Sequence, residues 1–151
     1  MTGETFEIIR ATADDLDLLV PLFDGYRQFY HQPTDHAAAR VFLAARLARD
    51  ESVIFLARRG DQGLGFIQLY PSFSSVSLQR LWILNDLFVA PDGRRQGVAE
   101  ALLERARAFA VETESKGLVL ETMPDNAAAR QLYEKLGWRR IEPDCRYHLY
   151  I

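Results

Sequence analysis

Two adjacent arginines and a glycine stand where an apolar, strand-like run that ends at Val89 gives way to an amphipathic helical pattern. The first turn of a helix presents unpaired backbone N–H groups and about half a positive charge, so it attracts anions without any special side chain. Gly97 allows a ligand to approach the backbone closely, while Arg94 and Arg95 add positive charge. This spacing predicts a site for a phosphate or a pyrophosphate. The structural alternative is an ordinary strand-to-helix turn with a solvated basic flank.

No other nucleotide-binding motif competes with this junction. The chain contains no G-x-x-x-x-G-K-[ST] sequence, which disfavours a Walker-type NTPase. In the segment GDQGLG at 60–65, Gly63 and Gly65 have the spacing of the first two glycines of the fingerprint G-x-G-x-x-G, but the third glycine is missing; the segment is interpreted as a hairpin turn. The formal net charge of −3 argues against a nucleic-acid binder that works through bulk positive charge.

The composition is that of a single intracellular globular domain, expected over 5–151. The 48% of hydrophobic residues supplies a core. The single cysteine, Cys145, excludes an internal disulfide and a cysteine metal cluster, which fits a reducing cytoplasm. His31 and His36 flank a proline loop without a third ligand nearby, so no metal site is expected. Because the N-terminus lacks a signal-peptide pattern and no apolar run approaches the ~20 residues of a membrane span, we expect a cytoplasmic protein with no membrane partner.

The hydrophobic periodicity predicts the element order β-α-α-β-β-β-α-β-α-β-β. Strands are expected at 5–12, 52–59, 66–73, 78–89, 116–122, 138–141 and 145–151, and helices at 13–30, 35–50, 97–114 and 126–137. Pro71 cannot donate a ladder hydrogen bond, so its strand should be bulged or at an edge there. The economical fold is of the α+β class, with a central mixed β-sheet and helices on both faces. The β-α-β unit from Leu81 to Thr122 should be parallel and right-handed.

The residues of the junction also match a family pattern. The sequence RRQGVA at 94–99 fits the pattern [QR]-x-x-G-x-[GA], follows LNDLFVAPDG and precedes the strand GLVLET. Further on, Asn126, Tyr133 and the pair Gly137-Trp138 reproduce a second pattern. In both respects the chain resembles the GNAT family of N-acetyltransferases, over nearly its whole length. The resemblance implies one domain whose central sheet splays after the fourth strand.

The resemblance implies acetyl-CoA as the acetyl donor. By position, the backbone of Leu87, Phe88 and Val89 would pair with the amides of the pantetheine arm, although Leu87 and Val89 also fit ordinary core positions. The pyrophosphate would lie against the backbone at the start of the helix. The residues implied there are Arg94, Arg95, Gln96, Gly97, Val98, Ala99 and Glu100. Asn126 should cap its own helix and, by resemblance, also lie near the CoA arm.

Tyr133 is the residue that the resemblance implies as the general acid. Its phenol would hydrogen-bond the CoA sulfur and protonate the departing thiolate. A phenol has a pKa of about 10 and a thiol one of about 8.5, so full transfer is slightly uphill, but a hydrogen bond that strengthens as charge develops still helps. From the sequence alone, a tyrosine beside Leu132 and Leu136 equally fits a core position.

The sequence leaves the general base open. An alkylamine with a pKa of about 10.4 is only about one part in 10³ neutral at pH 7, which costs ~4.6 kcal/mol, so a carboxylate or a water chain must take its proton. Polyamine-type relatives carry Glu-Asp before the apolar triplet of the fourth strand, whereas this chain has Asn85 and Asp86. Both are candidate catalytic positions, but the Asn85 amide cannot act as a base. Asp86 can act directly, through water, or by binding a cationic acceptor; the alternative is a strand-end carboxylate that faces solvent.

The acceptor side in the family is usually built by the first two helices and their loop, here residues 24–36. Tyr26 and Tyr30 can form an aromatic wall there, since aromatic faces attract cations. A packed amphipathic helix with a solvated end is the alternative. Strand alternation places Trp82 and Asp86 on one face unless a bulge intervenes, which adds Trp82 to the candidate acceptor-binding residues.

Three functions remain open on the sequence. The first is an acetyl-CoA-dependent N-acetyltransferase that acts in a ternary complex on a primary amine, which can be a polyamine, an amino-acid-like metabolite or a protein lysine. The segment YRQFY at 26–30 resembles the histone and polyamine acetyltransferase branch. The second is a non-catalytic CoA-binding module, which Asn85 in place of an acid favours, and the third is nucleic-acid binding through scattered arginines. Related enzymes often form dimers through their last strands, for which the segment 146–151 is available.

Overall fold

The structure is a computed structural model that describes residues 5–141 and 145–151. The chain forms two compact units, Met1–Glu121 and Thr122–Ile151. The larger unit contains the sheet and the candidate residues for the pyrophosphate, the pantetheine arm and the acceptor. The smaller unit contains one helix, α4, with Asn126 before it and Tyr133 within it. A single domain over 5–151 stays a prediction.

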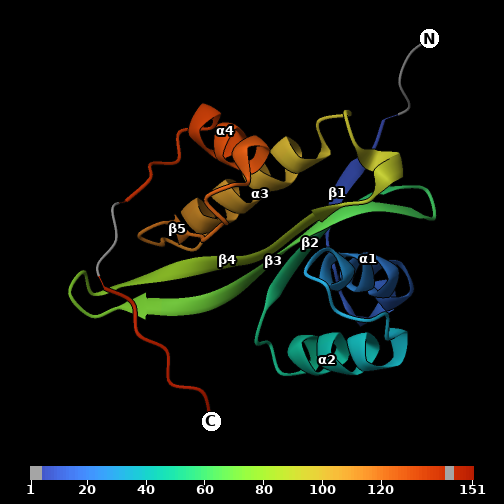
Figure 1. The fold of residues 1–151 in the computed structure, drawn as a ribbon, viewed down its shortest axis with the longest axis horizontal. Coiled ribbons are helices and arrows are strands. Elements are labelled where there is room, and N and C mark those ends of the chain that lie inside the picture. Colours follow the sequence, from blue (N-terminus) through green and yellow to red (C-terminus); the bar gives the residue numbers. More distant parts are fainter. Residues whose placement is uncertain (1–4, 142–144) are drawn as a thin grey trace. The chain divides into compact units, whose positions relative to one another are not determined.

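The larger unit is built on a five-stranded sheet with the order β1-β2-β3-β4-β5 (Figure 1). The strands are β1 Glu7–Arg10, β2 Val53–Arg59, β3 Gln62–Ser74, β4 Gln79–Val89 and β5 Leu118–Val119. Neighbouring strands are antiparallel from β1 to β4, and the parallel pairing predicted for β4 and β5 is confirmed. The pairing of β3 with β2 ends at Leu69, so Pro71 stands at an edge of the sheet, as predicted.

Helices cover both faces of this sheet, as predicted. The helices of the larger unit are α1 Leu16–Phe29, α2 His36–Ala48 and α3 Val98–Glu112. α1 and α2 pack together on one face, where Leu19 and Phe66 belong to one buried cluster (Figure 1). α3 lies on the other face, where the ring centroid of Phe109 is 5.5 Å from that of Phe55 and 5.0 Å from that of Trp82. Each helix buries the apolar stripe that its 3.6-residue period predicts.

A β-bulge in β4 exchanges the two faces of the sheet for the side chains of the residues that follow it. Gln68 of β3 pairs with Asp86, but the next residue of β3 pairs with Leu84, which leaves Asn85 as the extra residue. Residues that face each other across an antiparallel pair lie on the same side of the sheet. Trp82 therefore lies on the α3 side, and Asp86 lies on the α1 side. The expectation that regular alternation places these two residues on one face is wrong, because the bulge inserts one residue between them.

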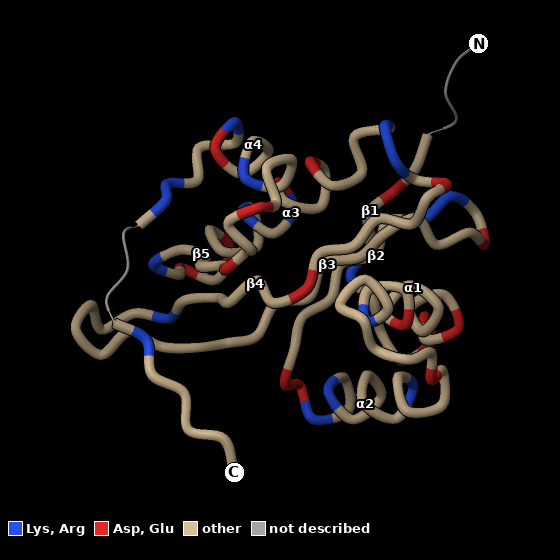
Figure 2. Tube along the Cα trace, in the orientation of Figure 1, with Lys and Arg blue, Asp and Glu red and all other residues tan. Residues whose placement is uncertain are grey.

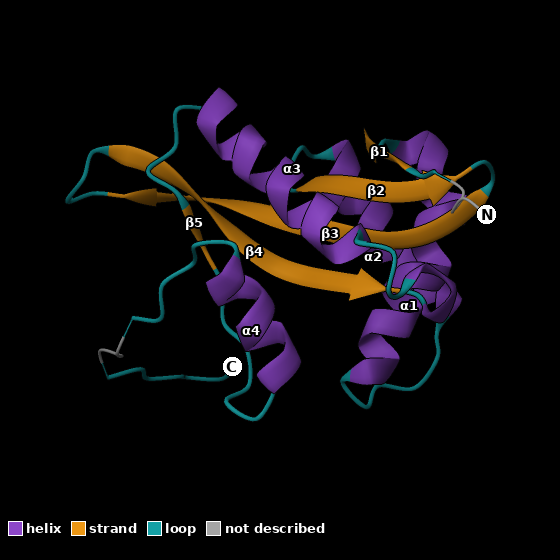
Figure 3. Cartoon of the chain, turned by 90° about the horizontal axis from the view of Figure 1, so that it is seen from above, coloured by secondary structure: helices purple, strands orange, loops and turns teal. Residues whose placement is uncertain are grey.

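The sheet opens between β4 and β5, as the resemblance implies. The two strands pair only at Trp82 with Leu118 and at Ile83 with Val119. From residue 84 to 89, β4 therefore has no strand on that side within the described part of the chain. Figure 3 shows the short β5 beside the much longer β4.

The two closing strands predicted at 138–141 and 145–151 are wrong for the described residues, since neither segment is in strand conformation. Alternating apolar residues form a strand only where another strand satisfies their backbone groups. Tyr147 and Leu149 are exposed instead of lying on a buried sheet face. The apolar residues at 145–151 alternate as in a strand, but the sequence of this segment cannot show whether another strand lies beside it.

Two other elements are shorter than predicted. The strand expected at 116–122 is reduced to Leu118–Val119. The turn expected at 60–65 is limited to Gly60 and the residue after it, because β3 begins at Gln62. Glycines within 60–65 suggested a turn, but most of this segment pairs with β2 and belongs to the sheet.

The smaller unit contains α4, Ala127–Lys135, whose first turn is capped as predicted. The side chain of Asn126 accepts a hydrogen bond from the backbone N–H of Ala129 at 3.3 Å. None of the residues of α4 is buried. The hydrogen bonds at the two ends of this helix therefore contribute a large share of its stability.

The last turn of α4 ends at a glycine, also as predicted. Gly137 has a φ of 94°, and its N–H donates to the carbonyl of Glu134 at 3.1 Å. The N–H of Trp138 donates to the carbonyl of Tyr133 at 2.9 Å. These two bonds form the Schellman motif that closes a helix. The spacing of Asn126, Tyr133, Gly137 and Trp138 is therefore explained by the caps at the two ends of α4.

Candidate active site

The start of α3 has the backbone of an anion site. Arg95 and Gly97 are in the left-handed region, with φ values of 62° and 79°, and left-handed residues beside right-handed ones turn successive N–H groups toward a common point. Val98, Ala99 and Glu100 form the first turn of the helix. Within the part of the chain that the structure describes, the backbone N–H groups of Gly97, Val98 and Ala99 have no hydrogen-bond partner. The junction therefore offers the donors that a phosphate group requires.

The polar side chains of the junction hold its turn in place. Nε of Arg94 donates to the carbonyl of Val89 at 3.2 Å, and Nε2 of Gln96 donates to the carbonyl of Asp92 at 2.7 Å. The guanidinium of Arg59 in β2 donates to Oε1 of Gln96. Arg94 and Gln96 thus shape the loop, in addition to any contact with a ligand.

Leu87, Phe88 and Val89 keep one backbone edge without a strand partner. On one side they pair with β3, where Phe88 faces Phe66, and on the other side β5 does not reach them. The ring of Phe88 packs against Gly25 of α1, where an added Cβ would come within 2.9 Å of a ring atom. An extended chain that carries amide groups can pair with such an edge as another strand does. This edge fits the pantetheine arm of CoA.

Asp86 is buried at the bulge, with donors to both carboxylate oxygens. The residue is 2% exposed. Gln68 Nε2 donates to Oδ2, and Asn85 Nδ2 donates to Oδ1 at 2.8 Å. The hydroxyl of Tyr26 interacts with the same carboxylate and donates to the carbonyl of Asn85 at 3.1 Å. A carboxylate that faces solvent is therefore not what the structure shows, and the Asn85 amide supports Asp86.

Burial gives this group of residues unusual proton affinities. It raises the pKa of Asp86 above the ordinary value, although the hydrogen bonds from Asn85, Gln68 and Tyr26 act in the opposite direction. Burial and the nearby charge of Asp86 raise the pKa of Tyr26, and they raise the pKa of Tyr70 to about 12. Both phenols therefore stay protonated at neutral pH. A carboxylate with a raised pKa is better matched to take a proton from an amine.

The structure brings Tyr26, Tyr30 and Asp86 together at the C-terminal end of α1. The ring centroids of Tyr26 and Tyr30 are 5.1 Å apart, and Tyr26 packs edge-on against Phe66 at 6.0 Å. Tyr30 is 47% exposed, whereas Tyr26 is partly buried and reaches the carboxylate. The aromatic wall and the carboxylate thus form one cluster, which runs from the surface to the interior.

The structure separates Trp82 from this cluster. Trp82 lies on the α3 side of the sheet, packs on Phe109, and donates from Nε1 to Oγ1 of Thr113 at 2.9 Å. Its indole is buried and its polar group is satisfied. The bulge at Asn85 is the exception under which Trp82 and Asp86 do not share a face, so the reason for adding Trp82 to the acceptor-binding residues is lost.

Two buried polar residues of this region escaped the sequence analysis. Gln68 lies in the apolar run of β3, and a polar residue inside a buried strand is the signal that identifies it. Asp24 accepts from the hydroxyl of Thr34 at 2.6 Å and from the N–H of Asp35 at 2.8 Å, and Nε2 of His36 lies 3.2 Å from its Oδ2. Asp24 therefore ties the loop between α1 and α2 to the end of α1 that carries the aromatic wall.

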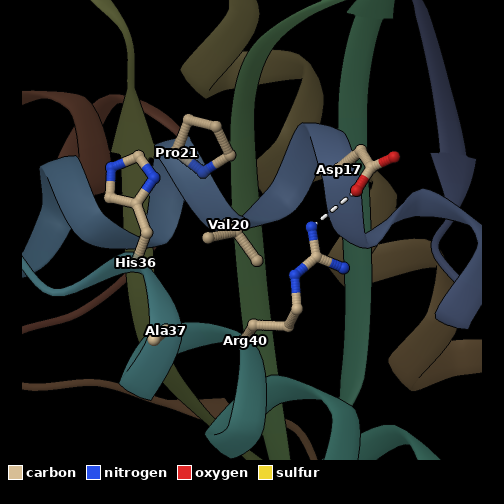
Figure 4. A pocket seen from close by; sticks show the side chains of 6 residues that line it. All are labelled: Asp17, Val20, Pro21, His36, Ala37 and Arg40. Atoms are coloured by element: carbon tan, nitrogen blue, oxygen red, sulfur yellow. Dashed lines mark hydrogen bonds and ion pairs between the residues drawn. The ribbon is translucent and has the colours of Figure 1, made fainter.

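A shallow pocket between α1 and α2 does not include this cluster. It is lined by Asp17, Val20, Pro21, His36, Ala37 and Arg40 (Figure 4). Arg40 and Asp17 form an ion pair across it. Tyr26, Tyr30 and Asp86 are not among its lining residues.

Charged residues are interspersed along the elements rather than gathered on one of them (Figure 2). In α3, Arg105 pairs with Glu112 at 3.3 Å, and Arg107 lies 3.9 Å from Glu104. The arginines considered for nucleic-acid binding therefore share this helix with acids. Among the residues that the structure describes, no group of three His, Cys, Asp or Glu side chains can hold a metal ion, and no helix is long and apolar enough to cross a membrane. The absence of a metal cofactor stays a prediction.

Tyr133 lies in the last turn of α4, where the helix cap fixes it. Its carbonyl accepts the hydrogen bond from the N–H of Trp138, and the two ring centroids are 5.9 Å apart. Tyr133 is partly buried. The cap accounts for Asn126 by itself, so a second role of Asn126 toward CoA stays a prediction.

The sequence has clear counterparts among known proteins. The family model described as the acetyltransferase (GNAT) family matches residues 19–138. A Bacillus subtilis (strain 168) protein named uncharacterized N-acetyltransferase YhfO is 46% identical over 131 residues, which cover 87% of this chain and 88% of that protein. A Haemophilus influenzae protein named probable acetyltransferase is 34% identical over 116 residues, which cover 76% of this chain and 80% of that protein.

Solved structures agree with these relatives. A crystal structure of a probable acetyltransferase has a TM-score of 0.90 and 48% identity, and the match covers 96% of this chain and 97% of that one. The aminoglycoside N-acetyltransferase AAC(6')-Iy in complex with CoA has a TM-score of 0.82 at 18% identity, over 99% of this chain and 98% of that one, and so shares the fold.

The chain therefore belongs to the GNAT family of acetyltransferases. It is an N-acetyltransferase, and the donor that this family uses is acetyl-CoA. This membership decides for an enzyme and against the non-catalytic CoA-binding module that Asn85 had favoured.

Proposed function

We propose that this N-acetyltransferase acetylates a primary amine, with Asp86 as the residue that accepts the amine proton. The observation that carries the proposal is the buried carboxylate at the bulge of β4, next to the aromatic pair of Tyr26 and Tyr30. Aromatic faces attract a cation, and the carboxylate then holds it and takes up its proton. A polyamine, an amino-acid-like metabolite and a protein lysine all present such a group.

Two features of the larger unit support acetyl-CoA as the donor, which supplies the acetyl group as an activated thioester. The backbone N–H groups from Gly97 to Ala99 fit the pyrophosphate, and the guanidinium groups of Arg94 and Arg95 add charge there. The open edge of β4 from Leu87 to Val89 fits the amides of the pantetheine arm.

The proposed reaction is a direct transfer in a ternary complex. The ammonium group gives one proton to Asp86, the nitrogen forms a bond to the acetyl carbon, and the C–S bond breaks with its electron pair on sulfur. We assign the proton that the thiolate takes to Tyr133, on the strength of the family resemblance; the second N–H proton then restores the phenol by way of solvent. Making a neutral amine costs ~4.6 kcal/mol at pH 7, so the reaction needs a group at the amine, here the Asp86 carboxylate, that accepts its proton.

The first test is a thermal-shift titration with acetyl-CoA, combined with a screen of amines for thiol release. At a hundredfold excess over Kd, binding should stabilise the fold by ~2.7 kcal/mol. We expect thiol release with one class of amine. Asp86→Asn should keep the shift with acetyl-CoA and lower turnover by about 10²- to 10⁴-fold, the range for a general base.

Asp17→Asn is the matched control, because it makes the same aspartate-to-asparagine change at an exposed position of α1. It should keep both the shift and the turnover. A shift without thiol release on any amine would overturn the proposed acceptor, and full turnover in Asp86→Asn would overturn the proposed base. Without any shift, the junction before α3 would be a turn and nothing more.

We further propose that the enzyme works in the cytoplasm and forms a homodimer through residues 146–151. The single cysteine, Cys145, suits a reducing compartment. Tyr147, Leu149 and Ile151 are exposed apolar residues at every second position. An extended segment of this kind can pair with a second copy of the chain.

A further inference from the structure

Gln68 and Asp86 face each other across the β3–β4 pair in the interior of the larger unit. They are 0% and 2% exposed. Nε2 of Gln68 donates to Oδ2 of Asp86. The other end of the same amide, Oε1, is buried and has no hydrogen-bond partner among the residues of the described chain. A buried acceptor without a donor is costly, so this one calls for a reason.

The two charge states of a carboxyl group need different partners. An ionised carboxylate only accepts hydrogen bonds, whereas a protonated one carries an O–H that must donate. A side-chain amide offers a donor at its nitrogen and an acceptor at its oxygen, and a half turn about its last bond exchanges the two. Oε1 of Gln68 has no hydrogen bond to a described residue that the half turn could break. The half turn breaks the hydrogen bond from Nε2 to Oδ2 of Asp86, which a protonated carboxyl no longer needs.

We propose that Gln68 is a positioning residue that follows the charge of Asp86: Nε2 donates to the ionised carboxylate, and Oε1 accepts from the protonated carboxyl. This inference rests on the proposed function, in which an N–H bond of the amine breaks, its electron pair stays on nitrogen, and an O–H bond forms on Asp86. The half turn gives that O–H an acceptor. The proton is thereby held until solvent removes it and the amide turns back.

The other groups around this carboxyl cannot both donate to its ionised form and accept from its protonated form in the same buried position. Asn85 holds the second oxygen but is exposed, so water can replace it. Tyr26 of α1 and Tyr70 of β3 are the titratable groups that face the carboxyl, and both keep their protons at neutral pH. Arg46 of α2 acts on Tyr70. Gln68 is fully buried away from water, so its amide is the group that has to reorient.

The direct test is an NMR titration of the wild-type enzyme. It follows the carboxyl carbon of Asp86 and the side-chain amide nitrogen of Gln68 as the pH is lowered. Both resonances should move with one common midpoint, because the amide changes partner when the carboxyl gains its proton. An amide resonance of Gln68 that stays constant through the titration of Asp86 would overturn the proposal.

A variant gives the kinetic counterpart. Gln68→Met keeps the length and the packing of the side chain but removes both hydrogen-bonding groups. The ionised Asp86 then loses a donor and the protonated Asp86 loses an acceptor. Because a hydrogen bond to the charged form is the stronger of the two, the titration midpoint of Asp86 and the acid limb of kcat/KM should rise together, by up to about one pH unit. Gln62→Met, the same change at the exposed start of β3, should leave both at the wild-type value. An unchanged midpoint in Gln68→Met would contradict the inference.

The outcomes separate this inference from the proposed function. If Asp86→Asn keeps its turnover, the proposed base is wrong, and the NMR titration still decides whether Gln68 follows the charge of Asp86. If Asp86→Asn loses its turnover while the Gln68 amide stays constant, the proposed base stands and the role of Gln68 falls.

Discussion

Two residues before α3 set the direction of the N–H groups that would meet the pyrophosphate. Gly97 takes a φ of 79°, which costs a glycine nothing, and Arg95 takes a φ of 62°, which an L-residue adopts at a cost of about 1–2 kcal/mol. A strained residue persists only where the surrounding structure holds it. Gln96 does so here, since its side chain is bonded both to Asp92 and to Arg59.

Gly97→Ala should therefore lower stability and affinity for separate reasons. An added Cβ meets no atom within 4 Å, so the loss of stability comes from φ alone, about 1–2 kcal/mol. The affinity for acetyl-CoA should also fall, because a side chain at this position hinders the close approach of a ligand to the backbone. Gly60→Ala is the control, since Gly60 has a φ of 58° and equally open surroundings. Denaturant unfolding and calorimetric titration should show two destabilised variants, of which only Gly97→Ala binds acetyl-CoA more weakly; equal Kd values would contradict this.

Asp24 makes the stability of the larger unit depend on pH. Burial by itself would raise the pKa of Asp24, but the hydrogen bonds from Asp35 and Thr34 and the charges of His36 and Arg27 outweigh it and leave this pKa below its ordinary value. The stability that this carboxylate contributes is therefore complete above the ordinary pKa of an aspartate. It is lost as the pH falls through the lowered pKa of the folded state.

Asp24→Asn should cost about 1–3 kcal/mol of unfolding free energy at pH 7, because the amide satisfies fewer of these donors. The difference from wild type should shrink as the pH falls through the lowered pKa of Asp24. Asp17→Asn removes an exposed ion pair and should change stability by less than about 1 kcal/mol. Denaturant unfolding over a range of pH values checks both, and a difference that is constant across the acid range would contradict the assignment to ionised Asp24.

At the scale of elements, local signals were predictable and long-range register was not. Asn126 and Gly137 mark the ends of α4 because a cap needs only the few residues beside it. The bulge at Asn85 depends on how β4 lies against β3, and nothing in the alternation of β4 marks an inserted residue. The sequence therefore identified Asp86 as a candidate but could not show its face, its burial or its pairing with Gln68.

Because α4 buries none of its residues, its cap should control how often it opens. Asn126→Ala removes the side-chain bond to Ala129, at a cost of about 1 kcal/mol. Hydrogen exchange of the α4 amides should speed up about fivefold, while exchange in α3 stays as in wild type. Asn126→Asp keeps an acceptor at the cap and should restore slow exchange. If Asn126→Ala and Asn126→Asp exchange alike, the cap does not hold this helix.

At the scale of the whole molecule, the family pattern and the element order indicated the enzyme class, but the acceptor stayed outside the reach of the sequence. In the proposed function, the acetyl donor is recognised largely by backbone groups at a junction that a short sequence pattern marks. The cluster proposed to bind the acceptor joins Tyr26 of α1, Gln68 of β3 and Asp86 of β4, which only the folded sheet brings together. Because these residues are far apart in the chain, no spacing pattern in the sequence could predict such a cluster.

The proposed homodimer is also a property of the whole molecule, and a single charge tests it. Leu149 is 87% exposed in a segment of alternating apolar residues, and a glutamate there would be buried without a partner if a second copy pairs with this segment. Light scattering over a range of concentrations should show wild-type dimers and monomeric Leu149→Glu. Val76→Glu, at a position 99% exposed between β3 and β4, places the same charge on another apolar site and should stay dimeric. Equal masses for wild type and Leu149→Glu at every concentration would rule this segment out as the interface, since no dimer that buries Leu149 could tolerate the unpaired charge.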